Sequence, residues 1–165
     1  MKAIVAVDKK WGIGKKNDLL FNLPEDMKFF REKTKGKTVC MGYNTLLSFP
    51  NSKPLKNRVN IVLAPNDVVR DDCIVVHTLE ELFSELNKYD DVFVIGGAMF
   101  YKTMLPYCEE IFVTKVDADG EATVFYPNLD ENADFSCIYE SEPVESNGLT
   151  IKFTTYKNFN VQKFN

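Results

Sequence analysis

The feature that most constrains the fold is a regular alternation between short apolar runs and helical patterns. Runs dense in β-branched residues and bounded by turn formers occur at residues 3–7, 38–42, 59–64, 73–77 and 92–97. Such runs are typical of strands buried on both faces. Helical patterns lie at 24–34, 43–49, 78–89 and 98–108. Because right-handed crossovers connect such elements, this order predicts a mostly parallel sheet.

The pattern changes after Cys108. Three further segments are typical of strands, and they lie at residues 110–118, 135–146 and 149–159. The sequence Ser146-Asn147-Gly148 between the last two predicts a hairpin turn, and therefore an antiparallel edge. The chain contains no repeat, linker or low-complexity segment. We therefore expect a single α/β domain.

Composition excludes several classes of function. The chain has 165 residues, of which 45% are hydrophobic, and 20 basic against 24 acidic residues give it a net charge of -4. This balance argues against a nucleic-acid surface, which needs clustered Lys and Arg. The apolar runs are too short to span a bilayer, and the N-terminus lacks the features of a signal peptide. We expect a monomer with neither a nucleic-acid nor a membrane partner.

The cysteines indicate a reducing compartment. They form no CxxC pair, have no histidine nearby, and stand at positions 40, 73, 108 and 137. This spacing is typical of buried small apolar residues rather than of disulfides or zinc ligands. We therefore expect a cytoplasmic location.

Two glycine-containing junctions between a strand and a helix are candidates for anion binding. Gly96 and Gly97 end one apolar run, and Gly42 ends another, with Asn44 or Thr45 available to cap the helix or bind phosphate. Backbone N–H groups and a helix N-terminus can approach a pyrophosphate closely at such points. Each signal alone is weak, because two glycines often form only a tight turn and the GxGxxG spacing is absent. Two junctions at the carboxyl edge of one parallel sheet favour a dinucleotide.

Asp26 raises the question of what pairs with it. The helix expected at 24–34 begins at Pro24, and Asp26 shares or borders the apolar face that includes Phe30. A carboxylate there is costly unless something pairs with it, although acids are also common in a first helical turn for simpler reasons. The single histidine, His77, cannot complete a catalytic triad or a metal site with any residue nearby. Catalysis with one acid and a hydride cofactor fits this inventory.

Four motifs together resemble dihydrofolate reductase. They are "IVAVDKKWGIGKKNDLLFNLPEDMKFFREKT", "TVCMGYNT", "VIGGAMFY" and "VTKVDADGEATVFYP", and the likeness covers residues 1 to 157. The resemblance implies one domain at 1–159, with a mainly parallel eight-stranded sheet, an antiparallel C-terminal edge and four flanking helices, followed by a tail at 160–165. It implies NADPH-dependent reduction of 7,8-dihydrofolate to tetrahydrofolate, which supports one-carbon metabolism and thymidylate synthesis. Antifolate inhibitors are the other implied ligands.

The resemblance also implies a substrate site. Asp26 matches the carboxylate that holds the pterin 2-amino group and N3, Thr114 a threonine bonded to it, and Arg58 the arginine that grips the glutamate α-carboxylate. The implied catalytic residues are Asp26, Phe21, Leu19, Thr114 and Tyr101. The implied substrate contacts are Ile4, Val5, Asp26, Met27, Phe30, Phe49, Lys53, Leu55, Arg58, Ile95 and Thr114. No metal is expected.

The implied cofactor contacts fall on the glycine junctions and on a mobile loop at 13–19. They are Ala6, Ile13, Gly14, Asn17, Leu19, Gly42, Tyr43, Asn44, Thr45, Leu63, Ala64, Pro65, His77, Ile95, Gly96, Gly97, Ala98, Met99, Phe100 and Tyr101. Tyr43, Asn44, Pro65 and His77 stand where the family often has basic or hydroxyl residues around the 2′-phosphate. We therefore expect NADPH to be preferred, with reduced discrimination against NADH.

Other departures concern the loop and the acid. Phe21 replaces a tryptophan, Leu20 a proline, and Ala122 an acidic residue that often latches the mobile loop. Burial is expected to raise the pKa of Asp26, and the helix N-terminus and the cofactor ring to lower it, so the net sign stays open. Two alternatives also stay open. One is a related reductase of a pyrimidine intermediate of riboflavin synthesis, and the other is a catalytically idle folate- or nucleotide-binding protein.

Overall fold

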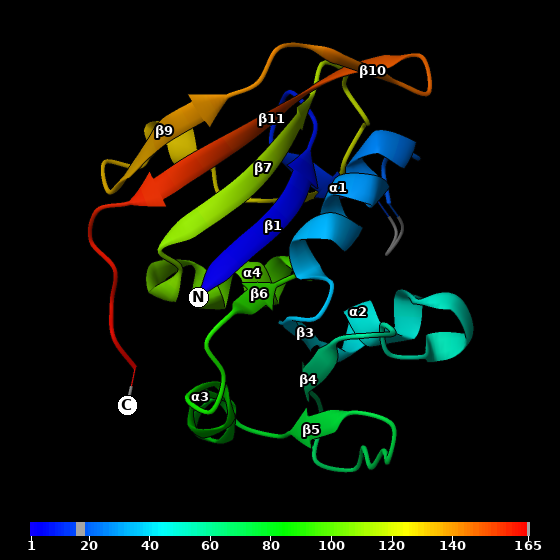
Figure 1. Ribbon diagram of the computed structural model, residues 1–165, viewed down its shortest axis with the longest axis vertical. Helices are drawn as coiled ribbons and strands as arrows, with labels where there is room; N and C mark the ends of the chain where they lie inside the picture. The colour runs from blue at the N-terminus through cyan, green and yellow to red at the C-terminus, as the bar shows by residue number, and fades with distance from the viewer. Residues whose placement is uncertain (16–18, 165) are drawn as a thin grey trace.

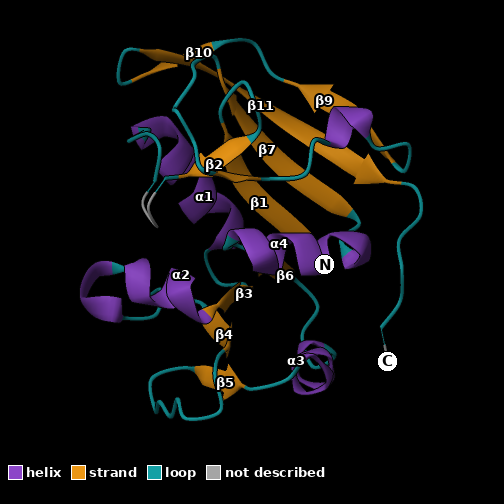
Figure 2. Ribbon diagram, turned by 180° about the vertical axis from the view of Figure 1, so that it is seen from behind, coloured by secondary structure: helices purple, strands orange, loops and turns teal. Residues whose placement is uncertain are grey.

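A mixed sheet runs through the molecule, and helices cover both of its faces (Figures 1 and 2). The computed structural model describes residues 1–15 and 19–164. The strand order across the described sheet is β10-β11-β7-β1-β6-β3-β4-β5. The first half of the chain provides β1 (Lys2–Val7), β3 (Thr38–Gly42), β4 (Val59–Leu63), β5 (Ile74–Val76) and β6 (Val92–Val94). These strands pair in parallel, as the alternating pattern predicts.

The C-terminal part of the chain forms the antiparallel edge. Its strands are β7 (Glu110–Val116), β9 (Phe135–Glu140), β10 (Val144–Ser146) and β11 (Leu149–Asn158). β7 is parallel to β1, and β11 is antiparallel to β7. β10 and β9 pair with successive parts of β11, so they form one interrupted edge strand. Counted that way, the described sheet has the eight strands that the resemblance implies. The turn at Asn147 and Gly148, both with positive φ, closes the expected hairpin.

Among the residues that the structure describes, four helices flank the sheet, and each begins within one residue of the expected position, although α3 ends three residues early. They are α1 (Pro24–Thr34), α2 (Tyr43–Ser48), α3 (Leu79–Leu86) and α4 (Ala98–Met104). α1 and α2 pack with one apolar cluster and α3 and α4 with another, so the helices form two layers. The expected helix at 98–108 is shorter, because Pro106 cannot continue the α-helical hydrogen bonds and a 3-10 turn, η2 (Leu105–Tyr107), follows instead.

A second, two-stranded sheet has no counterpart in the sequence prediction. It pairs β2 (Gly12–Gly14) with β8 (Val124–Phe125). Both strands are too short for periodicity to show, and glycine is a poor strand signal. The pairing matters because it fixes the start of the segment at 13–19 that was expected to be a mobile loop.

The residues expected to form a C-terminal tail lie against the body of the protein. The N–H of Gln162 donates to the carbonyl of Pro106 at 2.9 Å, and the Phe164 ring stacks on Phe83 with centroids 4.5 Å apart. Residues 160–164 therefore cover part of α3 and η2. Within residues 1–15 and 19–164, no helix is long and apolar enough to cross a bilayer.

Candidate active site

Asp26 meets its protein partner across the gap between α1 and the sheet. Pro24 starts the helix, which places Asp26 in the first turn, facing β7. There the hydroxyl of Thr114 donates to Asp26 Oδ1 at 2.6 Å, and Thr114 itself is 1% exposed. Burial raises the pKa of Asp26, and the bond from Thr114 opposes this rise only in part. The net shift of the Asp26 pKa, whose direction the sequence left open, is therefore upward.

Tyr101 and Ile4 form a second contact near this acid. The Tyr101 hydroxyl, on α4, donates to the carbonyl of Ile4 on β1 at 2.7 Å. Burial raises the pKa of Tyr101, so the phenol stays a donor at neutral pH. In the β1–β7 register, Ala6 lies opposite Thr114, two residues beyond Ile4. The centre of the sheet therefore brings together Asp26, Thr114, Ile4 and Tyr101.

The two glycine junctions lie side by side. β3 and β6 are neighbours, and the N–H of Gly42 donates to the carbonyl of Gly96 at 2.9 Å. Gly96 has φ +142, and a Cβ there would lie 3.1 Å from Oγ1 of Thr45; a Cβ on Gly97 would lie 3.3 Å from the same atom. Thr45 therefore packs over both glycines and caps no helix, since the N-cap of α2 is Gly42. Glycine suits both positions, because Thr45 packs where a side chain would begin and because the φ of Gly96 is positive.

The next strands extend this edge. Ala64 and Pro65 follow β4, and His77 follows β5, which pairs with β4. Nδ1 of His77 lies 3.2 Å from the carbonyl oxygen of Ala64 and 3.0 Å from that of Pro65. The residues expected at the adenosine end of the cofactor are therefore adjacent in space.

Arg58 is held in place by the side chains of Thr34 and Asn60, neither of which was predicted from the sequence. Its Nε donates to the hydroxyl of Thr34 at 2.8 Å, and its Nη1 donates to the backbone carbonyl of Lys56 at 2.7 Å. Asn60 fixes the loop itself, because its amide donates to the carbonyls of Leu55 and Arg58 and its Oδ1 accepts from the N–H of Leu55. The available signal was polarity in an apolar context, since Asn60 interrupts an otherwise apolar strand.

The surroundings of Arg58 are strongly cationic. It lies on a cavity of about 450 Å³ that is lined by Lys28, Arg31, Glu32, Lys35, Lys56, Asn57 and Arg58. Burial, and then the charge of Arg31, lower the pKa of Arg58. The Arg58 guanidinium also lies 5.8 Å from the centroid of the Phe30 ring. This corner can receive carboxylates from a ligand that rests against Phe30.

The remaining predicted residues divide by position. Phe30, Phe49, Leu55, Ile95 and Tyr43 are partly buried around one apolar cluster that includes Ile4. Val5 and Phe100 pack in the cluster on the other face, so only their backbones are available there. Leu19, Met27 and Met99 are exposed apolar side chains. Ile13 and Gly14 lie in β2, Lys53 follows the 3-10 turn η1 (Pro50–Ser52), Asn44 and Leu63 flank the glycine edge, and Asn17 lies outside the described residues.

Comparison with known proteins agrees with this arrangement. The sequence model of one family, described as dihydrofolate reductase, matches residues 1–158. The chain belongs to the dihydrofolate reductase family. It is 33% identical over 163 residues to a dihydrofolate reductase of Bacillus subtilis, covering 97% of this chain and 95% of that protein. It is 34% identical over 131 residues to one of Staphylococcus haemolyticus, covering 78% of each.

A solved structure from the dihydrofolate reductase family matches the fold. It is dihydrofolate reductase from Enterococcus faecalis in complex with NADP(H) and RAB-propyl, with a TM-score of 0.84 and 31% sequence identity, covering 95% of each chain. No cluster of three or more His, Cys, Asp or Glu side chains that could hold a metal occurs in the described residues.

Proposed function

We propose that this protein reduces 7,8-dihydrofolate to 5,6,7,8-tetrahydrofolate with NADPH, in the service of one-carbon metabolism. The observation that carries the proposal is the Asp26–Thr114 pair beside the glycine edge of the sheet. One carboxylate of raised pKa stands next to an edge shaped for a dinucleotide. This is the inventory that hydride transfer to a protonatable ring requires.

Asp26 and Arg58 define the two ends of the substrate. Thr114 occupies one side of Asp26 Oδ1, which leaves acceptor capacity for a pterin edge with two N–H donors, its 2-amino group and N3. The substrate's glutamate carries carboxylates that suit Arg58 and its cationic cavity. Phe30 lies between the two ends and supplies an apolar wall for the rings.

The cofactor fits the glycine edge. Thr45 fills the space over Gly96 and Gly97 so closely that any side chain on either glycine would meet it, which leaves bare backbone facing the ligand. Gly96 and Gly97 can offer this backbone to the pyrophosphate, because the N–H of Gly42 is already bonded to the carbonyl of Gly96. The ends of β4 and β5 can receive the adenosine. When bound, NADPH supplies the hydride that passes from nicotinamide C4 to pterin C6.

The side chains bind, orient and polarise the substrate. Asp26 holds the pterin and stabilises positive charge on it, while a water delivers the proton to N5, because the bonds from Asp26 reach the far edge of the ring. Holding two rings at reacting distance is worth about 7–11 kcal/mol in favourable cases. Phe21 packs among Leu23, Val116 and Ile151, so it excludes water there without offering an N–H.

The absorbance of NADPH at 340 nm, which is a property of the reduced cofactor, provides the test. Wild-type protein with dihydrofolate should consume NADPH, and Asp26→Asn should be slower by about 100-fold or more at neutral pH. The neighbouring acid provides the control, because Glu25→Gln should keep wild-type turnover. No oxidation by the wild type would leave only an idle binding protein, and undiminished turnover by Asp26→Asn would reject the role of Asp26.

We also infer a cytoplasmic location. All four cysteines are free thiols, as expected in a reducing compartment. Cys40 and Cys108 are buried as expected, whereas Cys73 is partly buried and Cys137 is exposed, which the sequence did not predict. A monomer remains our expectation for its state in solution.

A further inference from the structure

Asp8 is a buried carboxylate outside the substrate and cofactor positions proposed above. It follows β1 directly and is 2% exposed. Its Oδ1 accepts from the N–H groups of Lys10 and Gly12 at 2.8 and 2.7 Å, and its Oδ2 accepts from the N–H of Gly120 at 3.0 Å. The carboxylate thus joins the β1–β2 turn to a loop 112 residues away. Such burial is tolerated only because both oxygens are satisfied.

The turn around Asp8 fits this loop with no space to spare. A methyl group on Gly12 would lie 2.9 Å from both carboxylate oxygens of Asp8 and would overlap the side chain of Ala122. The N–H of Lys9 donates to the carbonyl of Ala118 at 3.1 Å. The carboxylate is therefore one part of a close contact between the two segments, and it reaches the loop at Gly120.

The opposite side of Gly120 carries the segment that leads into α1. A Cβ on Gly120 would lie 2.9 Å from Cδ1 of Leu20 and 3.0 Å from Cζ of Phe21. Phe21 then packs against the cluster that contains Leu23, the residue immediately before α1. A continuous series of contacts therefore runs from Asp8 through Gly120 and Phe21 to Leu23, three residues before Asp26.

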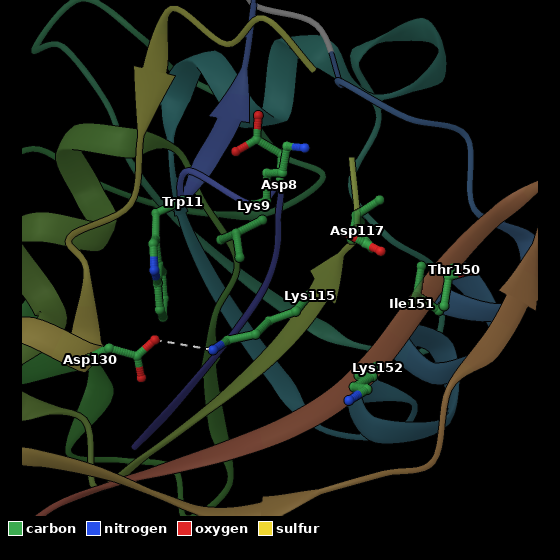
Figure 3. A pocket seen from close by; sticks show the side chains of 11 residues that line it. Asp8, Lys9, Trp11, Lys115, Asp117, Asp130, Thr150, Ile151 and Lys152 are labelled. Carbon is green, nitrogen blue, oxygen red and sulfur yellow. Dashed lines mark hydrogen bonds and ion pairs between the residues drawn. The ribbon is translucent and has the colours of Figure 1, made fainter. Parts of the chain in front are cut away.

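Asp8 directs its carboxylate away from the charged groups nearby. It lines a cavity of about 350 Å³ together with Lys9, Trp11, Lys115 and Asp130. Figure 3 shows the Asp8 carboxylate pointing away from the ion pair between Lys115 and Asp130, whose atoms are 3.2 Å apart. Within the described part of the chain, no ion pair involves Asp8. The hydrogen bonds that the Asp8 carboxylate accepts therefore come from backbone N–H groups.

We propose that Asp8 is a positioning residue for the reaction, which acts by holding Gly120 beneath Leu20 and Phe21 and so fixing the entry to α1 and Asp26. The expected effect on the rate of hydride transfer rests on the proposed function. The expected effect on the position of Gly120 does not. A carboxylate is required, because the amide of an asparagine could serve the donors on one side only and would turn its own N–H groups toward the other. Loss of the contact would leave a buried N–H without an acceptor.

The first test compares Asp8→Asn with Gly120→Ala. Asp8→Asn breaks the hydrogen bond to Gly120, whereas Gly120→Ala keeps the carboxylate and pushes Leu20 and Phe21 away. In single-turnover experiments with NADPH and dihydrofolate, each should slow hydride transfer about tenfold, since small misplacements of reacting groups are costly. The equilibrium dissociation constant of dihydrofolate should change less than the rate. The double variant should be no slower than the slower single variant, because both act through one contact.

Asp119→Asn is the matched control. Asp119 lies in the same loop, is partly exposed, and pairs with Lys10 at 2.9 Å, but it does not touch Gly120's contacts with Leu20 and Phe21. It should keep the wild-type rate of hydride transfer. Equal slowing by Asp119→Asn, or rate losses that multiply in the double variant, would overturn the proposal. If Asp8→Asn does not fold, an unchanged rate in Gly120→Ala would overturn it alone.

Hydrogen exchange separates this inference from the enzymatic proposal. The Gly120 amide should be protected from exchange in the wild type and exposed in Asp8→Asn, whether or not the protein turns over dihydrofolate. Trp11 is the only tryptophan in the sequence and lies in the turn after Asp8, so its fluorescence should change in the same variant. Retained protection of Gly120 in Asp8→Asn would reject the contact itself.

Discussion

At the scale of single residues, Asp26 combines two opposing demands. To polarise a bound ring, the Asp26 carboxylate must lie where water is excluded. Burial at that position raises its pKa, even though the Thr114 hydroxyl donates to it. The folded protein therefore holds the proton of Asp26 more tightly than the unfolded chain. Stability consequently falls as pH rises from the unfolded pKa of Asp26 through its folded pKa, and the loss persists above that window.

Removal of this charge should stabilise the protein while it disables the enzyme. Asp26→Asn keeps an oxygen for the Thr114 hydroxyl but carries no charge, so its melting temperature at pH 7 should exceed that of the wild type. The difference should shrink as the pH falls toward about 4, where the unfolded carboxyl is protonated. Thermal melts of both proteins at a series of pH values provide the measurement. A variant less stable than the wild type at pH 7 would contradict the assigned pKa direction.

Tyr43 should determine how well the two nicotinamide cofactors are distinguished. It follows Gly42 at the start of α2 and brings no positive charge to the position expected to face the 2′-phosphate. A charge-assisted hydrogen bond is worth about 1.5–3 kcal/mol. Tyr43→Arg should therefore raise the kcat/KM ratio of NADPH over NADH by roughly 10- to 100-fold.

Steady-state kinetics with both cofactors provide the comparison. Tyr43→Phe is the control, because it changes no charge and should leave the ratio as it is. A wild-type ratio already above about 1000, some 4 kcal/mol, would show that another group reads the 2′-phosphate.

The sequence indicates residues of this kind unevenly. Asp26 was identified because it falls within a motif that resembles the family, and Arg58 because of its position after Ser52-Lys53-Pro54-Leu55 in the same resemblance. Thr34 and Asp8 were not, because each bonds a group that only the fold brings near, and Asn60 was not, because it bonds the backbone of an irregular loop. Their signal is a polar side chain at a buried position, and burial is not visible in a sequence without knowledge of which loops meet.

At the scale of elements, the end of α1 and the start of β4 together build the position of Arg58. Thr34, the last residue of α1, accepts from the Arg58 side chain, and Asn60, near the start of β4, bonds the backbone on both sides of the loop. Two rigid elements thus hold a loop residue in a defined orientation. The substrate's carboxylate end depends on this support rather than on Arg58 alone.

Asn60→Ala should weaken substrate binding and stability together. It leaves the backbone groups of Leu55 without partners, and each buried unsatisfied group costs about 1–3 kcal/mol. The KM for dihydrofolate should rise about tenfold or more, with a smaller change in kcat, and urea denaturation should show the lost stability. Thr34→Val provides the comparison, because it removes the hydroxyl that accepts from Arg58 and donates to the carbonyl of Phe30 but leaves the loop backbone bonded to Asn60. It should raise KM at a smaller cost in stability. An unchanged KM in Asn60→Ala would contradict this account.

Elements differ in how well the sequence specifies them. The parallel strands were predictable because burial on both faces produces near-continuous apolar runs, as in β3 and β4. The pair β2 and β8 was not, because two short strands with glycine have no periodicity of their own. At α3, the Thr78 hydroxyl accepts from the N–H of Glu81, as in a capping box. The Glu81 carboxylate accepts from the backbone N–H of His77, whereas a capping box would have it accept from that of Thr78.

At the scale of the whole molecule, the cofactor edge spans strands from the middle of the chain. The strands β6, β3, β4 and β5 are neighbours in that order across the sheet. The end of each strand contributes residues proposed to contact NADPH. A ligand across this edge links elements that otherwise meet only through parallel pairing. Binding should therefore act on the global unfolding equilibrium and not on one element.

NADPH should accordingly raise the melting temperature, and the shift should grow with the logarithm of its free concentration above the dissociation constant. At a free concentration of about 100 times its dissociation constant, a ligand of the folded state adds about 2.7 kcal/mol. For a chain of this size, that corresponds to a shift of roughly 5–10 °C. Differential scanning calorimetry with and without NADPH measures the shift, and Gly96→Ala, whose added methyl meets Thr45, should lose most of it. If NADPH raised the melting temperature of Gly96→Ala as much as that of the wild type, the proposed position of the cofactor at this edge would be wrong.

The place of β1 in the sheet affects how the protein is made. β1 pairs with β6 and β7, which follow it much later in the chain and begin at Val92 and Glu110. On a ribosome, its apolar residues must therefore wait unpaired until most of the chain has emerged, and no substrate site can exist before Thr114 does. A growing chain of this protein is thus expected to expose β1 until β6 and β7 are made, and to gain its activity in one late step.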